Sequence, residues 1–286
     1  MPLPALVTIL IRMEEQLNRA IRRIAERGGN LVVLTGAGIS AESGIPTFRG
    51  TDGFWTVGSR NYRPEEMATF AMFSREPEAV WQWYLYRIGI CRRAEPNPGH
   101  LAVAKMEEIF QKRFLLITQN VDGLHLRAGN SPERTYQIHG NIETLHCGRE
   151  CSDALCRLPD QVRPKEKDEP ISAEELKALR CPKCGAFRRP HVLWFDECYD
   201  EEHFRFNSSI EAASRADMLL VVGTSGATNL PMQVGSIAAS RGAVVVDVNP
   251  DFNPFSELAA RAGGFFCQGP AGKILPEFVE AMGARI

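Results

Sequence analysis

Four cysteines are spaced as two pairs that could hold a metal ion. Cys147 and Cys151 are separated by three residues, and Cys181 and Cys184 by two. Short-spaced thiolate pairs are typical of tetrahedral zinc sites, and four protein ligands leave no position open for a substrate. The spacing therefore predicts one structural zinc ion. Two alternatives stay open: Cys156 could replace Cys151 as a ligand, and the pairs could be buried thiols of a ribbon that has lost its metal.

A glycine-rich loop follows a short apolar run at residues 31–34. Its sequence, Gly36-Ala37-Gly38-Ile39-Ser40-Ala41, fits G-x-G-x-x-A, in which the glycines let backbone approach the pyrophosphate of a dinucleotide. The alternative is an ordinary strand-to-helix turn. No acidic residue closes a second strand about 20 residues later, which disfavours a dehydrogenase that transfers hydride. The loop is suited to clamping a dinucleotide.

Four short apolar runs predict the strands that must position these residues. They cover residues 31–34, 114–118, 218–222 and 243–248, with helix-like stretches at 101–110, 201–214 and 232–241 between them. Another helix is expected over residues 13–24, after an irregular arm that contains Pro2 and Pro4. Alternating strands and helices predict an α/β fold with a parallel sheet covered on both faces. Ligands gather at the carboxyl ends of such strands.

Two regions interrupt this alternation. Residues 53–95 are rich in aromatic residues and arginine, and read as helices in an insertion. Residues 140–195 carry five of the eight cysteines and a charged, proline-containing stretch, which predicts a small module held together by a metal. The other cysteines, Cys91, Cys198 and Cys267, have no partners in the sequence and are expected to be packing residues.

Composition excludes several classes of protein. The 286 residues include 33 Lys plus Arg and 35 Asp plus Glu, a formal net charge of −2. This balance offers no electrostatic reason to expect nucleic acid or an anionic membrane as a direct partner. No apolar run approaches the ~20 residues of a membrane span, and the N-terminus is a poor secretory signal. We therefore expect a cytoplasmic protein with free or metal-bound cysteines.

Six segments in a fixed order closely resemble the sirtuin family of NAD-dependent protein-lysine deacylases, over roughly residues 14–282. They are GAGISAESGIPTFRG (36–50), TQNVDGLH (118–125), IHGN (138–141), HVLWF (191–195), GTS (223–225) and QGPAG (268–272). The resemblance implies a Rossmann-type NAD-binding domain with helices on both faces of its sheet, made of residues 13–52, 96–139 and 196–286. It also implies a small domain, composed of a helical insertion (53–95) and a zinc ribbon (140–195).

The resemblance further implies a set of NAD-binding residues. They are Gly36, Ala37, Gly38, Ile39, Ser40, Thr47, Phe48, Arg49, Gln119, Asn120, Val121, Asp122, Gly223, Thr224, Ser225, Asn249, Pro250, Asp251 and Ala271. Many members have Asp in place of Thr47, so no carboxylate-based role is implied there. From the residues alone, Asn120 and Asp122 could simply be turn residues before Gly123.

By the same resemblance His139 is the general base, acting with Asn120 and Asp122. An unperturbed imidazole pKa of about 6.5 suits that task. The implied products are free lysine, nicotinamide and O-acyl-ADP-ribose. Rival functions on this site are ADP-ribosyl transfer or NAD hydrolysis, and a non-catalytic module that senses NAD; the intact set of Asn120, Asp122 and His139 argues against the latter.

The insertion contains a hint about the acyl group. Tyr84 and Arg87 are three residues apart, so they share one face of a helix. Arginine can bind a carboxylate bidentately, and a tyrosine hydroxyl can donate a further bond. The pair resembles the sirtuin subgroup that removes malonyl and succinyl groups, and Ala68 matches the small residue that enlarges its acyl pocket. The alternative is an aromatic core stripe with a surface arginine.

The remaining implied contacts are with an acylated lysine in a protein or peptide. His191, Val192, Leu193, Trp194 and Phe195 match the strand that pairs with the substrate backbone, where main-chain hydrogen bonds dominate. Asp196 stands where the family usually has glycine. We expect a monomer.

Overall fold

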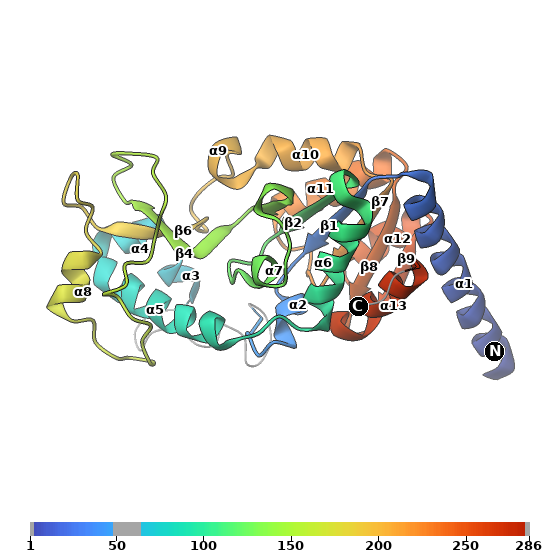
Figure 1. The fold of residues 1–286 in the computed structure, drawn as a ribbon, viewed down its shortest axis with the longest axis horizontal. Coiled ribbons are helices and arrows are strands. Elements are labelled where there is room, and N and C mark those ends of the chain that lie inside the picture. Colours follow the sequence, from blue (N-terminus) through green and yellow to red (C-terminus); the bar gives the residue numbers. More distant parts are fainter. Residues whose placement is uncertain (1–2, 48–63, 284–286) are drawn as a thin grey trace.

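The computed structural model describes residues 3–47 and 64–283 of the chain, with side chains from residue 15 in the first range and residue 66 in the second. A parallel sheet and its helices form one end of the elongated molecule, and a smaller sheet with several helices forms the other (Figure 1).

Within the described residues, six strands form the larger sheet in the order β3-β2-β1-β7-β8-β9, and every neighbouring pair is parallel. This is the strand order of a doubly wound Rossmann sheet, which reverses between β1 and β7. The strands are β1 (Leu31–Thr35), β2 (Phe114–Thr118), β3 (Thr135–Gln137), β7 (Met218–Val222), β8 (Val244–Asn249) and β9 (Phe265–Gln268). The four predicted strands are confirmed, and the short strands β3 and β9 were not predicted.

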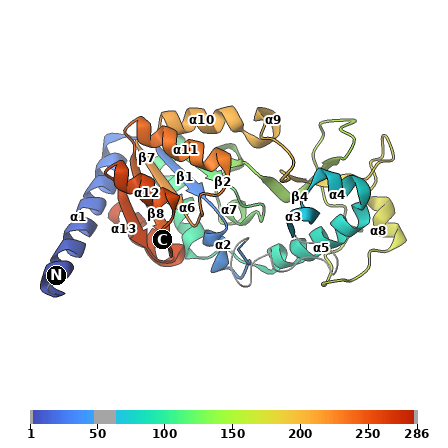
Figure 2. The same ribbon diagram turned by 180° about the vertical axis from the view of Figure 1, so that it is seen from behind.

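Helices cover both faces of this sheet because both faces of its strands are apolar (Figure 2). Leu31 and Val33 pack with α1, α6 and α13, whereas Val32 and Leu34 pack with α10, α11 and α12. These helices are α1 (Leu3–Arg27), α6 (Pro98–Phe110), α10 (Phe206–Ser214), α11 (Asn229–Ser240), α12 (Pro254–Arg261) and α13 (Ala271–Ala281). Across the described part of the chain, no helix is both long and apolar enough to cross a membrane.

Two sequence predictions about helices were wrong. The expected N-terminal arm is helical from Leu3, because Pro4 lies in the first turn, where the missing proline N–H breaks no helical hydrogen bond. The expected single helix over residues 201–214 is broken into α9 (Glu201–Phe204) and α10. The break occurs at Arg205, whose φ of 54° is in the left-handed region that ends a helix.

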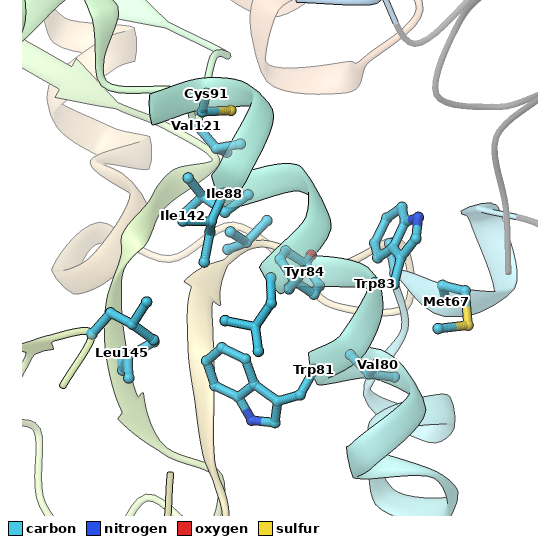
Figure 3. Close-up of a cluster of buried hydrophobic side chains, with 14 of the residues drawn as sticks. Met67, Val80, Trp81, Trp83, Tyr84, Ile88, Cys91, Val121, Ile142 and Leu145 are labelled. Atoms are coloured by element: carbon cyan, nitrogen blue, oxygen red, sulfur yellow. The ribbon is translucent and has the colours of Figure 1, made fainter. Parts of the chain in front are cut away.

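The smaller sheet has the order β5-β4-β6 among the described residues, and both pairings are antiparallel. Its core lies between β4 and α5: Trp81 and Ile88 face Ile142 and Leu145, while Trp83 lies on the side of Met67 (Figure 3). The elements of this part are α3 (Pro64–Met67), α4 (Phe70–Arg75), α5 (Pro77–Arg93), β4 (Gly140–Cys147), β5 (Cys156–Arg157), α8 (Ala173–Ala178) and β6 (Arg188–Val192). The helical character predicted for the insertion holds for its described part, and the exact domain boundaries stay a prediction.

Candidate active site

The glycine loop lies where the strand order of the large sheet reverses. Gly36 N donates to Val222 O over 2.9 Å, and Gly38 N donates to Gly223 O over 2.8 Å, so the loops after β1 and β7 are bonded to each other. A Cβ on Gly38 would lie 2.7 Å from the Cα of Gly223, closer than real Cβ contacts. These glycines are therefore required for backbone packing as well as for access of a ligand. The short helix α2 (Gly38–Ala41) begins here.

Ser40 joins the predicted residues of two strand ends. Its hydroxyl donates to Asp122 Oδ2 over 2.8 Å and lies 3.0 Å from Asn120 Nδ2, which also donates to Gly36 O over 3.1 Å. The ring of His100 approaches from α6, with Nε2 3.3 Å from Ser40 Oγ. The structure therefore brings the predicted residues Ser40, Asn120 and Asp122 together. The cluster is more than turn chemistry, because the side chains bond across loops far apart in the chain.

Burial controls the charges in this cluster. It raises the pKa of Asp122 above its ordinary range, although hydrogen bonds from Leu124 N and Ser40 Oγ act in the opposite direction. Burial also lowers the pKa of His100 to about 4, so this ring is neutral at pH 7. The carboxyl of Asp122 is therefore surrounded by uncharged hydrogen-bonding groups. Such a cluster can bind the hydroxyl and amide groups of a ligand without a further charged side chain.

Gln119 fixes the loop ends of β2 and β7 relative to each other. Its Nε2 donates to Thr224 Oγ1 over 2.9 Å, and its Oε1 accepts from Thr228 Oγ1 over 2.9 Å. Thr228 lies directly before α11, so this bond ties the loop after β2 to the start of that helix. Asn249 Nδ2 extends the network by donating to Thr224 O over 2.9 Å.

His139 is positioned by bonds at both ring nitrogens. Nδ1 lies 3.0 Å from the carbonyl oxygen of Gln119, an acceptor that requires Nδ1 to carry the proton. Nε2 therefore has the lone pair, and it accepts from the hydroxyl of Tyr199 at 2.7 Å. Burial lowers the pKa of His139 to about 4 and raises the pKa of Tyr199 well above its ordinary value. His139 is thus a neutral imidazole whose unprotonated nitrogen is held by a neutral phenol.

The other predicted NAD-binding residues divide into three groups. Phe48 and Arg49 lie outside the described residues. Several are buried or half-buried: Ala37, Ile39, Thr47, Val121, Thr224 and Ala271. Asp251 is exposed beyond β8, and Gln268 Nε2 donates to Pro250 O over 3.0 Å. Ser225 follows Thr224 on the loop after β7 and is exposed.

The predicted substrate strand lies at an edge. Among the described residues β6 pairs with β4 alone, with His191 opposite Asn141. Beyond the strand, Leu193 N donates to His139 O and Phe195 N donates to Ala68 O, both over 3.0 Å. The segment is therefore bonded both to the predicted base and to the predicted acyl-pocket residue. Val192 and Trp194 are buried, whereas Phe195 is 57% exposed.

The predicted acyl-pocket residues meet around Trp194. Tyr84 Oη accepts from Trp194 Nε1 over 2.8 Å, and the Arg87 guanidinium carbon lies 5.3 Å from the Tyr84 ring centroid and 4.5 Å from that of Trp83. Burial raises the pKa of Tyr84, against the nearby charge of Arg87. Arg87 is 3% exposed, which excludes the alternative of a surface arginine next to a stripe of aromatic core residues. A buried cation within an aromatic wall can bind an anion strongly.

Asp196, the residue in place of the usual glycine, caps a helix. Its carboxylate accepts from Phe70 N over 2.8 Å and from Ala71 N over 3.0 Å, the first two N–H groups of α4. Thr69 Oγ1 accepts from Met72 N over 3.1 Å and satisfies the third. Asp196 therefore connects the predicted substrate strand to the helical insertion.

The predicted zinc ligands come together. The ligand atoms of Cys147, Cys151, Cys181 and Cys184 all lie within 4.8 Å of one another. The Sγ atoms of Cys147 and Cys184 are 3.4 Å apart and those of Cys151 and Cys181 are 3.5 Å apart, near the ~3.8 Å that tetrahedral Zn–S bonds of ~2.3 Å require. This donor set fits one structural zinc ion.

The other cysteines differ from one another. Cys156 lies outside the cluster, and its Sγ interacts with Leu145 O and Arg188 Nη1 instead. Cys91 is buried as expected, and Cys267 packs partly buried against the core. Cys198 is exposed, so its assignment as a packing residue was wrong.

Sequence reasoning missed three residues of this site. His100 contacts Ser40, Tyr199 holds His139, and Glu42 Oε1 accepts from Gly272 N over 2.9 Å, which ties the end of α2 to α13. His100 had a local signal, because Asn97 and His100 have capping-box spacing at the start of α6. Tyr199 had none, since only the folded chain brings residue 199 to residue 139.

The large sheet is doubly wound, and the polar loops at its switch point are hydrogen-bonded to each other. A small module with four clustered cysteines accompanies it. These features define an α/β protein of the nucleotide-binding type. Residues 36–229 match the Sir2 family. An NAD-dependent protein deacylase of Leptospira interrogans is 41% identical over 249 residues, which cover 86% of this chain and 90% of the relative. Another from Pyrococcus furiosus is 38% identical over 260 residues, covering 91% and 96%.

Solved structures show the same likeness. A Sir2 homologue in complex with NAD has a TM-score of 0.76 at 34% identity, with 94% of each chain covered. A Sir2–p53 peptide–NAD⁺ complex has a TM-score of 0.70 at 28% identity, with 89% of this chain and 93% of that chain covered. The chain belongs to the Sir2 family, and the resemblance stated from the sequence is confirmed.

Proposed function

We propose that this chain is an NAD-dependent protein-lysine deacylase in which His139 is the general base. The observation that carries the proposal is the pairing of a neutral His139, oriented through Gln119 O, with the buried polar cluster of Ser40, Asn120 and Asp122 at the switch point. Relatives of about 40% identity named NAD-dependent protein deacylase support the same reaction.

The donor set fits NAD. The glycines of the loops after β1 and β7 allow close approach of phosphates to the backbone, and Asn120 and Asp122 offer amide and carboxyl partners for nicotinamide and ribose. When bound, NAD supplies the ribosyl carbon that accepts the acyl oxygen and the nicotinamide that leaves. Free lysine and O-acyl-ADP-ribose are the other products.

His139 takes a proton from a ribose hydroxyl in this proposal. Nε2 carries the lone pair, and the bond from Nδ1 to Gln119 O orients the ring and stabilises the positive charge that it gains. His139→Ala should keep the fold and bind NAD but lose deacylation. The expected loss of kcat is about 10²- to 10⁴-fold, as for other general bases. Full NAD-dependent turnover by this variant would refute the assignment.

The edge of β6 supports the binding of an extended peptide. A substrate strand laid along it would gain main-chain hydrogen bonds, which are largely independent of side-chain identity. The likeness to a structure of a Sir2–peptide–NAD⁺ complex supports this use. The peptide-binding edge should therefore accept many different amino-acid sequences around the acylated lysine.

We further propose that succinyl- and malonyl-lysine are preferred over acetyl-lysine, which is also accepted. The support is the buried Arg87 beside the Tyr84 hydroxyl, with the small Ala68 bonded through its carbonyl to Phe195 N. An acyl carboxylate would pair with the guanidinium, and this pair would be shielded from water. An acetyl group has no carboxylate with which to form this pair.

The test is a panel of acetyl, malonyl and succinyl peptides of one sequence, incubated with and without NAD and analysed by mass spectrometry. We expect kcat/KM to be highest for the acidic acyl groups, and Arg87→Met to reduce succinyl removal more than acetyl removal. A preference for acetyl that Arg87→Met leaves unchanged would overturn the acyl assignment while leaving the deacylase assignment intact. ADP-ribosylated protein or free ADP-ribose in place of O-acyl-ADP-ribose would overturn the deacylase assignment itself.

One zinc ion at the four clustered cysteines completes the proposal. It is structural, because the cysteines fill all four positions of a tetrahedron. A monomeric state and a cytoplasmic location belong to the proposal on composition alone, and sedimentation of the purified protein tests the first.

A further inference from the structure

Three of the six histidines form a cluster whose side chains the proposed reaction does not use. His146 lies on β4, His191 on β6 and His203 on α9, so residues from both parts of the molecule contribute. In Figure 1, α9 lies at the end of α10 that is nearest to β4 and β6. The ring centroids are 5.3 Å apart for His146 and His191, 5.7 Å for His191 and His203, and 6.5 Å for His146 and His203.

The first two rings are spaced as metal ligands. The Nδ1 atoms of His146 and His191 face each other at 3.4 Å. Two imidazole nitrogens on one tetrahedral ion, each at a bond length of ~2.0–2.1 Å, are about 3.4 Å apart, and their ring centroids are about 5 Å apart. Imidazole is the ligand that borderline divalent ions such as Zn²⁺ and Ni²⁺ accept most readily. The pair therefore has the separation that an ion would require.

The third ring is oriented by a carboxylate. His203 Nδ1 lies 3.0 Å from Asp200 Oδ2, so the proton is on Nδ1 and the lone pair is on Nε2. A carboxylate that accepts from the far nitrogen of a histidine is the usual support of a metal ligand. Among the described residues only the four cysteines have ligand atoms that all lie within 4.8 Å of one another, so the His203 ring must rotate toward His146 and His191 before the three rings can share an ion. The His203 side chain is 34% exposed on a four-residue helix, which leaves room for this rotation.

Solvent reaches the cluster from the side of His203, whereas His191 is 5% exposed. His191 and His203 both line an open groove of about 1190 Å³ on the described surface, together with the acidic side chain of Glu202. On its inner side, His191 stacks on Phe204, with ring centroids 5.5 Å apart and planes 12° apart. An ion can therefore reach the rings from solvent, and the stacking holds His191 in place while it does so.

We propose that His146, His191 and His203 form a second, exchangeable site for a borderline divalent transition-metal ion, separate from the cysteine site. Three protein ligands leave one position open to water. A bound ion would connect α9 to β4 and β6, and so tie the parallel-sheet part of the chain to the smaller sheet. The proposal is independent of the acyl group that the enzyme removes.

The test compares zinc content and cobalt spectra of the full chain. After equilibration with Zn²⁺ and removal of free metal by a weak chelator, the wild type should hold one equivalent more than His203→Gln or His146→Gln. The matched control Glu202→Gln changes a groove residue on α9 that is no ligand, and it should keep the extra equivalent. Asp200→Asn retains a capping side chain but weakens support of His203, so it should lower affinity about 10- to 100-fold.

Co²⁺ identifies the ligands. Cobalt at the histidines should give tetrahedral visible bands without the near-ultraviolet charge-transfer bands of thiolate ligands, and these visible bands should be absent from His203→Gln. Equal metal content in the wild type and both histidine variants would overturn the proposal, as would a second equivalent whose spectrum shows only thiolate ligation. In that case the rings serve only to pack α9 against β6.

Discussion

The hydroxyl of Tyr199 lies 2.7 Å from Nε2 of His139, so this tyrosine occupies the nitrogen through which the proposed base must act. The other nitrogen is held by Gln119 O at 3.0 Å. A ribose hydroxyl can reach Nε2 only when the Tyr199 hydroxyl gives up that position. Access to the proposed base therefore depends on the position of Tyr199, which lies on the segment between the substrate strand and α9.

Tyr199→Phe tests this coupling through the pH profile. The tyrosine hydroxyl donates to neutral His139 and so favours the neutral form, and its removal should raise the pKa of His139. A hydrogen bond of about 1 kcal/mol corresponds to about 0.7 pKa units, so the acidic limb of kcat/KM should move to higher pH by less than about one unit. Activity at neutral pH should be retained. Tyr136→Phe is the control, and an unmoved limb with activity lost would contradict the prediction.

Acid should destabilise the fold at pH values where most proteins are unaffected. Burial lowers the folded-state pKa of His100 and His139 to about 4, whereas the unfolded chain has the ordinary value of about 6.5. The unfolded state therefore binds protons that the folded state does not, between those two values. Stability is complete above pH 6.5 and falls as the pH drops toward 4, by up to about 1.4 kcal/mol per pH unit for each histidine.

Thermal unfolding across this pH range is the measurement. Tm should fall steadily from pH 6.5 to pH 4.5. A flat Tm over that interval would show that the two rings titrate normally in the folded protein.

Replacing single cysteines should distinguish the metal ligands from Cys156, which lies outside their cluster. Cys151→Ser should lose zinc from the cysteine site and lower Tm, because Cys151 Sγ lies 3.5 Å from Cys181 Sγ within the cluster. Cys156→Ser should keep the zinc, because Cys156 Sγ contacts Leu145 O instead. Elemental analysis of the two variants checks this. Metal retained by Cys151→Ser and lost by Cys156→Ser would assign the fourth ligand to Cys156.

Restoring the usual glycine at position 196 should weaken the fold. Asp196→Gly removes the carboxylate that accepts from Phe70 N and Ala71 N, and loss of such a cap costs about 0.5–2 kcal/mol. Asp196→Asn keeps an acceptor oxygen and should be milder. Denaturant unfolding of the three proteins gives the comparison. If Asp196→Gly is as stable as the wild type, the bonds to α4 contribute nothing.

Much of the site could be predicted because its signals are local. The strand ends, the G-x-G-x-x-A loop and the two cysteine pairs are short motifs whose chemistry depends on neighbours in the chain, and the structure brings them together. The Tyr84–Arg87 pair was predictable as one helix face, since residues three apart on α5 must be neighbours. Its burial was not, because that depends on Trp194 from a distant segment.

The amino-acid sequence by itself determined the α/β class, the Sir2 resemblance and the four clustered cysteines, because each rests on residue type and short spacing. The role of His139 as the base is what the resemblance implies, and it stays a proposal. The tertiary structure decided which groups meet across long separations in the chain. It placed Tyr199 on His139, Asp196 on the start of α4, and three histidines from three elements in one cluster. Such contacts arise from the packing of strands and helices, and no local pattern encodes them.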